Sequence, residues 1–276
     1  MIFPVLSSCA GDAQHHRRRG KTILQHRQCA GERCVLCCPP RLWPELQGAQ
    51  RHPYLSPRHE GVLFHEFGHA LHGILSDCQY NTLSGTAVAR DFVEMPSQFN
   101  ESFASIPEIF DHYARHTETG KPMPADLKER MLKSIIQTAY ALGENLTATC
   151  LDLAWHELTP EQIPSVYMAG AFEKEALHNI GLLDNQIPPR YSTSYFNHVW
   201  GGGYAAGYYS YLWTEVLAVN IANYFAEHGA LDPAVGQAFR DKILSRGNTK
   251  DQMEMFTDFT GMKSPDASGF LKAKGL

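Results

Sequence analysis

The segment HEFGH at residues 65–69 carries the residue types of a metal-dependent hydrolase at the spacing that such chemistry needs. His65 and His69 lie four residues apart, so on a helix they face the same way and can share one metal ion, while Glu66 remains free for chemistry. Apolar residues recur at helical spacing over 60–74, which predicts the amphipathic helix that this arrangement requires. The alternative for an isolated pair is two core histidines that bond backbone carbonyls.

A metal site built for hydrolysis also needs a third protein ligand and one open position for water. Glu94 is the candidate, because it lies 25 residues after His69 on a helix predicted over 91–101, a span that allows a turn and an antiparallel return. Asp91 and Gln98 lie one turn to either side of Glu94 and are candidates to orient the ligands. The alternative for Glu94 is a solvated carboxylate on a helix surface.

A second segment, 196–213, is rich in glycine and tyrosine. Three successive glycines at 201–203 predict a loop whose backbone can approach a ligand closely. Tyr204, Tyr208 and Tyr211 follow at spacings of four and three, which predicts one face of a helix over 204–228. The alternative is that these tyrosines are core residues whose hydroxyls reach the surface.

The amino-acid sequences of these segments resemble those of a known family of enzymes. HEFGHALHG at 65–73, LSGT at 83–86 and RDFVEMPSQ at 90–98 are similar, in order and spacing, to the catalytic signature of the M3 metallopeptidases, the group of thimet oligopeptidase and bacterial peptidyl-dipeptidase. The sequence of 196–213 resembles the substrate-binding loop and helix of the same family, with wording closer to the peptidyl-dipeptidase branch. The resemblance begins at about Gly61 and covers only the C-terminal portion of these longer enzymes.

The resemblance implies roles for individual residues. It makes His65, His69 and Glu94 the ligands of one Zn²⁺ ion and Glu66 the general base. The resemblance also implies that the substrate backbone is held, and the tetrahedral intermediate stabilised, by His198, Tyr204 and Tyr211. With Glu66 these are the catalytic residues that it implies.

The function implied by the resemblance is zinc-dependent hydrolysis of short peptides, either by release of C-terminal dipeptides or by internal cleavage. The alternative is a truncated, catalytically impaired fragment that binds zinc, with exposed apolar surfaces that the rest of an M3 enzyme would cover. Release of dipeptides requires a cation for the substrate carboxylate, for which Arg190 and Arg246 are candidates, a plain surface role being the alternative.

Composition sets limits on other functions. The 276 residues are 43% hydrophobic and 19% charged, with a net charge of −5, which is typical of a globular protein and favours neither nucleic acid nor membrane partners. Cys78 and Cys150 are isolated thiols, which favours a reduced, cytoplasmic location. The sequence does not determine the oligomeric state.

The first 53 residues differ sharply from the rest. They hold eight basic and three acidic residues, a balance of +5, whereas the remainder holds 16 and 26, a balance of −10. Five of the seven cysteines also lie there. We interpret 1–53 as a disordered or non-native leader and 54–276 as an M3-like catalytic domain; a zinc knuckle with a basic phosphate-binding cluster, or a lipoprotein signal, are the alternatives.

The fold class predicted for the chain is mainly α: a zincin-type helical domain, in which a glutamate completes the HExxH motif, with a minor β element. A short strand at 80–86 is the best candidate for that element. Further helices are predicted over 124–138, 140–157, 160–179, 232–246 and 250–260.

Overall fold

The computed structural model describes residues 57–116, 119–132, 135–184 and 186–276. The segment interpreted as a leader, 1–53, lies outside these residues. In chain order the elements are α4 (Pro57–Ile74), η1 (Asn81–Leu83), α5 (Arg90–Val93), α6 (Met95–Glu101), η2 (Ser102–Ser105), α7 (Pro107–Tyr113), α8 (Ala125–Leu132), α9 (Ile135–His156), η3 (Val166–Met168), α10 (Ala169–Asn179), η4 (Thr193–Tyr195), α11 (Asn197–Trp200), α12 (Ser210–His228), α13 (Pro233–Phe239), η5 (Arg240–Leu244), α14 (Gln252–Thr260) and α15 (Ala267–Ala273).

The described chain is mainly helical with very little β structure, as predicted, but the strand expected at 80–86 is wrong. Residues 81–83 form a single 3₁₀ turn, and Gly85 has a φ of +59°, which an extended strand does not allow. The carbonyl of Leu83 accepts a hydrogen bond from the backbone of Asn248 at 2.8 Å, so it pairs with a turn and not with a strand. Within the described residues, β pairing is confined to an isolated bridge between Arg115 and Pro122.

The helix predictions are confirmed in kind and corrected at several boundaries. Residues 160–168 stay outside α10, and 166–168 form the 3₁₀ turn η3. Pro164 disfavours helical backbone at Ile163, the residue before it. The break predicted near 139 is wrong, since α9 runs unbroken from Ile135 to His156. The helix predicted over 232–246 is α13 followed by one π-helical turn, η5. The helix predicted over 250–260 is confirmed, with Gly261 in the left-handed conformation at its C-terminal cap.

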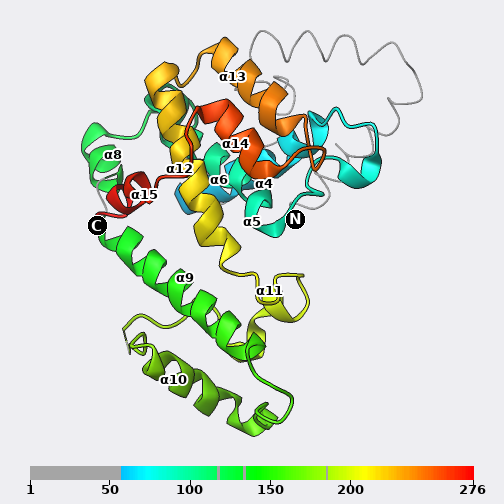
Figure 1. Cartoon of the computed structure of the whole chain (residues 1–276). Coiled ribbons are helices and arrows are strands. Elements are labelled where there is room, and N and C mark those ends of the chain that lie inside the picture. Colours follow the sequence, from blue (N-terminus) through cyan, green and yellow to red (C-terminus); the bar gives the residue numbers. More distant parts are fainter. Residues whose placement is uncertain (1–56, 117–118, 133–134, 185) are drawn as a thin grey trace.

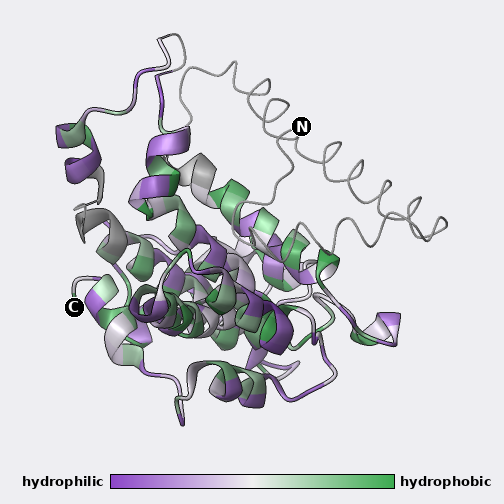
Figure 2. Ribbon diagram, turned by 90° about the horizontal axis from the view of Figure 1, so that it is seen from above, coloured by the Kyte–Doolittle hydropathy of each residue, from purple (hydrophilic) through white to green (hydrophobic). Residues whose placement is uncertain are grey.

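Figure 1 shows α12 running through the helical body, against α5, α6, α14 and α15. Hydrophobic and hydrophilic residues alternate along the helices in Figure 2, which is the pattern expected of helices that share a core. The centre of that core is a cluster of phenylalanine rings whose centroids lie 4.7 to 6.1 Å apart, contributed by Phe99, Phe103, Phe225, Phe239 and Phe259.

The long helices α9 and α10 lie beside each other at one end of the molecule (Figure 1). A small second core of Ala148, Phe196, Val199 and Tyr208 joins α9 to the glycine- and tyrosine-rich segment. Tyr211, at the start of α12, also packs against this second core. The second core therefore fixes the position of a segment that lies almost 130 residues beyond the HEFGH motif.

The contact between α4 and α6 is unusually close at Gly68. A Cβ atom added at Gly68 would lie 2.5 Å from the Cα of Ser97 and 2.8 Å from the carbonyl oxygen of Pro96. Only glycine therefore fits between the two backbones. Asn100 adds a direct link, since its side-chain amide donates to the carbonyl of Phe64 at 2.6 Å.

A buried carboxylate holds the loop before α12. Asp152 of α9 is fully buried, and its two oxygens accept hydrogen bonds from the backbone of Ala206 at 3.0 Å and of Tyr208 at 2.9 Å. Ala206 has a φ of +50°, so the chain cannot be helical there. For this reason α12 begins at Ser210 and not at Tyr204 as predicted from the spacing of the tyrosines.

We predict that Gly68→Ala lowers the free energy of unfolding by about 1–3 kcal/mol, because the added methyl group must push two backbones apart. Urea unfolding measures the change. Gly61→Ala on the same helix is the control, since a Cβ there meets nothing within 4 Å; it should be neutral or stabilising by up to about 1 kcal/mol. Equal midpoints for Gly68→Ala and the wild type would show that the helices do not need this close approach.

We predict that Asp152→Asn destabilises the chain by about 1–3 kcal/mol, because an amide group cannot accept both backbone hydrogen bonds. The backbone amides of Ala206 and Tyr208 should also exchange with solvent faster. Hydrogen exchange measured residue by residue tests this, with Asp126→Asn, at an exposed ion pair with Arg130, as the control. Unchanged protection of both amides would rule out the proposed clamp.

Candidate metal centre

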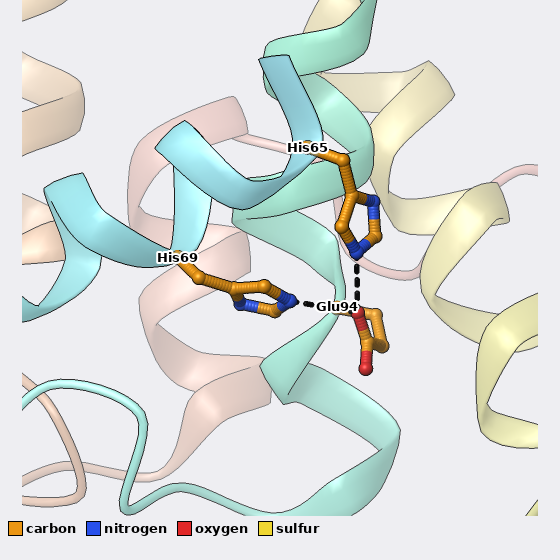
Figure 3. A group of neighbouring side chains, drawn as sticks. All are labelled: His65, His69 and Glu94. Atoms are coloured by element: carbon orange, nitrogen blue, oxygen red, sulfur yellow. Dashed lines mark hydrogen bonds and ion pairs between the residues drawn. The ribbon is translucent and has the colours of Figure 1, made fainter. Parts of the chain in front are cut away.

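The two histidines of the motif and Glu94 form one compact group. His65 and His69 project from α4, and Glu94 lies at the junction between α5 and α6 (Figure 3). The Nε2 atoms of the two histidines lie 3.2 Å and 3.1 Å from the same carboxylate oxygen, Oε2 of Glu94. One ligand atom from each residue lies within 4.8 Å of the others, so the group could hold a metal ion.

The junction between α5 and α6 explains how Glu94 reaches the histidines. Asp91 departs from helical backbone, with a ψ of 16°, and Glu94 itself separates the two short helices. Pro96 falls in the first turn of α6, where its missing N–H costs no hydrogen bond. Glu94 is only 3% exposed, so its charge is taken out of water and needs partners.

The electrostatics of the group follow from burial and hydrogen bonds. Burial lowers the pKa of His65, but hydrogen bonds to Glu101 and Glu94 outweigh it and raise that pKa to about 9. Burial raises the pKa of Glu94, yet its hydrogen bonds with His65, His69 and Tyr204 bring it well below its usual range. The two imidazoles thus stabilise the ionised carboxylate of Glu94.

The donor set fits a catalytic zinc ion. Two imidazole nitrogens and one carboxylate oxygen are the three protein ligands of many hydrolytic zinc sites, which leave further positions for water or substrate. Nδ1 of His65 bonds Oε1 of Glu101 at 2.7 Å, which leaves Nε2 of that ring directed at the group. Both His65 and His69 are partly exposed, so the centre can be reached from solvent.

Two residues that orient the ligands were missed from the sequence. Glu101 holds the ring of His65, and the hydroxyl of Ser97 is shared between the backbone carbonyl of Glu94 at 2.8 Å and its Oε2 at 3.2 Å. Glu101 lies two helical turns after Glu94, and this spacing is the signal that could have found it.

The two residues expected to orient the ligands make their hydrogen bonds elsewhere. Gln98 donates to the backbone of Tyr211 at 2.9 Å, and Asp91 accepts from the hydroxyl of Tyr209 at 3.2 Å. The expected helix face was wrong for Asp91, because the backbone is not one continuous helix through Asp91 and Glu94. Gln98 does lie one helical turn after Glu94, since its backbone donates to the Glu94 carbonyl at 2.9 Å.

The glycine- and tyrosine-rich segment lies against this group. The hydroxyl of Tyr204 donates to Oε1 of Glu94 at 2.5 Å, and the rings of Tyr204 and Tyr211 stack with centroids 5.1 Å apart. The ring centroid of His198 lies 6.1 Å from that of Tyr204 and 6.0 Å from that of Tyr211. The structure thus brings His198, Tyr204 and Tyr211 together beside Glu94, although Tyr204 is in a turn and not on the helix.

The close backbone approach expected of the glycines is present. A Cβ at Gly202 would lie 2.9 Å from the carbonyl oxygen of His198, and Gly203 has a φ of +80°. This tight turn is what folds Tyr204 back toward Glu94, since the backbone of Tyr204 donates to the same His198 carbonyl at 3.0 Å.

Three remaining candidates differ in their surroundings. Glu66 is exposed on α4, next to His65 in sequence. Arg190 lies 3.7 Å from a carboxylate oxygen of Glu144. Arg246 is exposed, and its guanidinium donates to the carbonyl of Asp241 at 2.7 Å, in a separate hollow that Lys242 and Lys250 also line.

Comparisons with known proteins agree with this geometry. The chain is 48% identical over 216 residues to dipeptidyl carboxypeptidase of Salmonella typhimurium and 45% identical over 216 residues to dipeptidyl carboxypeptidase of Escherichia coli. It is 38% identical over 222 residues to oligopeptidase A of Escherichia coli. Each match covers 78% of this chain and 31% of the relative, so the chain spans about a third of the length of these proteins.

A family model gives the same answer over most of the chain. The model described as peptidase family M3 matches residues 46–276, which include His65, His69, Glu94 and the whole segment from Phe196 to Tyr211. With a site that could hold a metal ion and matches to named peptidases, the chain belongs to peptidase family M3.

Proposed function

We propose that this chain is a zinc-dependent peptidase that hydrolyses short peptides and releases dipeptides from their C-termini. The observation that carries the proposal is the convergence of His65, His69 and Tyr204 on the buried Glu94. Similarity to two proteins named dipeptidyl carboxypeptidase supports the dipeptide-releasing mode over internal cleavage.

The metal would be held by Nε2 of His65, Nε2 of His69 and a carboxylate oxygen of Glu94. When bound, zinc supplies a Lewis acid that lowers the pKa of a water molecule to about 7 and polarises the scissile carbonyl. Glu101 fixes the ring of His65 through Nδ1, and Ser97 fixes the carboxylate of Glu94, so the three ligands are oriented before the metal arrives.

Glu66 acts as the general base in this proposal. Its carboxylate takes a proton from the attacking water and passes it to the nitrogen of the leaving dipeptide. The exposure of Glu66 supports the role, because the base must meet both water and substrate.

The segment before α12 supplies groups for the substrate. Tyr211 remains a protonated phenol at neutral pH, because burial and the charge of Glu94 raise its pKa, so it can donate to the developing oxyanion. Tyr204 is the alternative donor, once its hydroxyl leaves Glu94. Burial lowers the pKa of His198, which keeps its imidazole neutral and able to hold a substrate backbone group.

A second candidate function is a zinc-binding fragment without turnover. The observation that favours it is a group of exposed apolar side chains near α10, with Tyr167 94% and Val166 81% exposed. Such a surface is expected where the remaining two thirds of the longer relatives would pack. This candidate predicts bound zinc without cleavage.

No helix in the described part of the chain combines the length and the apolarity needed to cross a bilayer. Cys78 and Cys150 are free thiols in the structure. The cytoplasmic location inferred from them stays a prediction.

We predict that the chain binds one zinc ion and is stabilised by it, by about 2.7 kcal/mol when free zinc is 100-fold above its Kd. His69→Ala should abolish both effects, because two ligands remain. Metal analysis after dialysis and thermal unfolding with and without a chelator measure the change. His178→Gln, at an exposed histidine of α10, is the control. Stoichiometric zinc in His69→Ala would contradict the assigned ligands.

We predict that Glu66→Gln lowers the rate of peptide cleavage by about 100-fold or more while zinc remains bound, since the amide keeps the shape of the side chain but cannot take a proton. Cleavage of an N-terminally blocked peptide, with the products identified by mass, measures both the rate and the dipeptide-releasing mode. Glu108→Gln, at an exposed glutamate of α7, is the matched control. Unchanged cleavage by Glu66→Gln would exclude it as the base.

A further inference from the structure

Arg90 is a cation at the edge of the metal centre that the chemistry described so far does not use. It begins α5, four residues before Glu94, and its side chain is exposed. Its guanidinium carbon lies 4.9 Å from the centroid of the Tyr204 ring. The hydroxyl of the same ring contacts Glu94 at 2.5 Å. One phenol ring therefore lies between the guanidinium and the ligand group.

The loop of glycines leaves room for this guanidinium. A Cβ at Gly203 would lie 2.9 Å from a terminal nitrogen of Arg90, so the absence of a side chain lets the two approach. The cation is thus placed between the ring face of Tyr204 and the backbone of the substrate-binding loop.

Arg90 also lacks an acidic partner among the described residues, which distinguishes it from the other arginines considered. Arg190 is paired with Glu144 at 3.7 Å, and Arg246 points to the carbonyl of Asp241 in a separate hollow. The five N–H donors of a guanidinium form a fork that matches a carboxylate. Contact with an aromatic face leaves that fork free to bind one.

We propose that Arg90 binds the C-terminal carboxylate of the peptide and so sets the length of the released product at two residues. The inference rests on the proposed peptidase function. Two extended residues span about 7 Å. When the scissile carbonyl lies at the metal, the C-terminal carboxylate of the substrate therefore lies about 7 Å from the metal. The Tyr204 ring joins Arg90 to Glu94, with its centroid 4.9 Å from the guanidinium carbon and its hydroxyl 2.5 Å from Glu94, so we infer that Arg90 lies at such a reach.

The test is the binding of a dipeptide product in two forms. Alanyl-phenylalanine with a free carboxylate and the same dipeptide as its C-terminal amide are titrated into the zinc-loaded chain by calorimetry. The wild type should bind the acid about tenfold more tightly than the amide, because a charge-assisted pair is lost in the amide. Arg90→Gln should bring the ratio close to one, and Arg90→Lys should give an intermediate ratio, because lysine keeps the charge but not the fork.

Arg190→Gln is the matched control, since Arg190 is also an exposed arginine, near His198 through their shared contact with Tyr191. It should leave the ratio unchanged. The ratio of acid to amide is also insensitive to a general loosening of the Tyr204 ring, which would weaken both ligands alike.

Several outcomes would overturn the anchor: equal binding of acid and amide by the wild type, an unchanged ratio in Arg90→Gln, an equal loss in Arg190→Gln, or no binding of either dipeptide. The proposed function fails in a different way. A chain that prefers the acid through Arg90 but cleaves no peptide would contradict the peptidase proposal and support the anchor.

Discussion

The close approach of α4 and α6 at Gly68 is the constraint on which the candidate site depends. His65 and His69 flank Gly68 on α4, and Glu94 precedes α6, so the distance between these backbones sets the distance between the ligands. A side chain at this position would separate the helices and carry the carboxylate away from both imidazoles. Gly68 therefore helps to bring the candidate metal ligands together, although it offers no ligand atom itself.

The ligand group was predictable from sequence because its information is local. Two histidines one helical turn apart face the same way whatever surrounds them, and the segment from Arg90 to Gln98 identified Glu94 through its family wording. The helices were predictable for the same reason, apart from their ends. Pro164 lies inside the helix predicted over 160–179 and argued against helical backbone before it. The length of the apolar pattern nevertheless favoured a helix there.

The parts that could not be predicted depend on contacts between distant segments. The start of α12 is decided by Asp152, which is 58 residues before Ser210 and offers the loop two acceptors in place of helical hydrogen bonds. The expected strand failed because a turn at Asn248 uses the carbonyl of Leu83. Arg90 falls inside the recognised family segment, yet its position over Tyr204 depends on how the glycine loop folds back. Periodicity within one segment holds none of this information.

The hydrogen bond from Tyr204 to Glu94 links the glycine- and tyrosine-rich segment to the group of His65, His69 and Glu94. One carboxylate oxygen faces the histidines and the other accepts from the phenol of Tyr204 in the glycine- and tyrosine-rich segment. Any ligand that moves Tyr204 changes the basicity of Glu94, and any cation on Glu94 changes the acceptor offered to Tyr204. By thermodynamic reciprocity, occupancy of the loop and occupancy of the metal centre alter each other by the same free energy. The side chain of Tyr204 thus couples the two halves of the candidate site directly through Glu94.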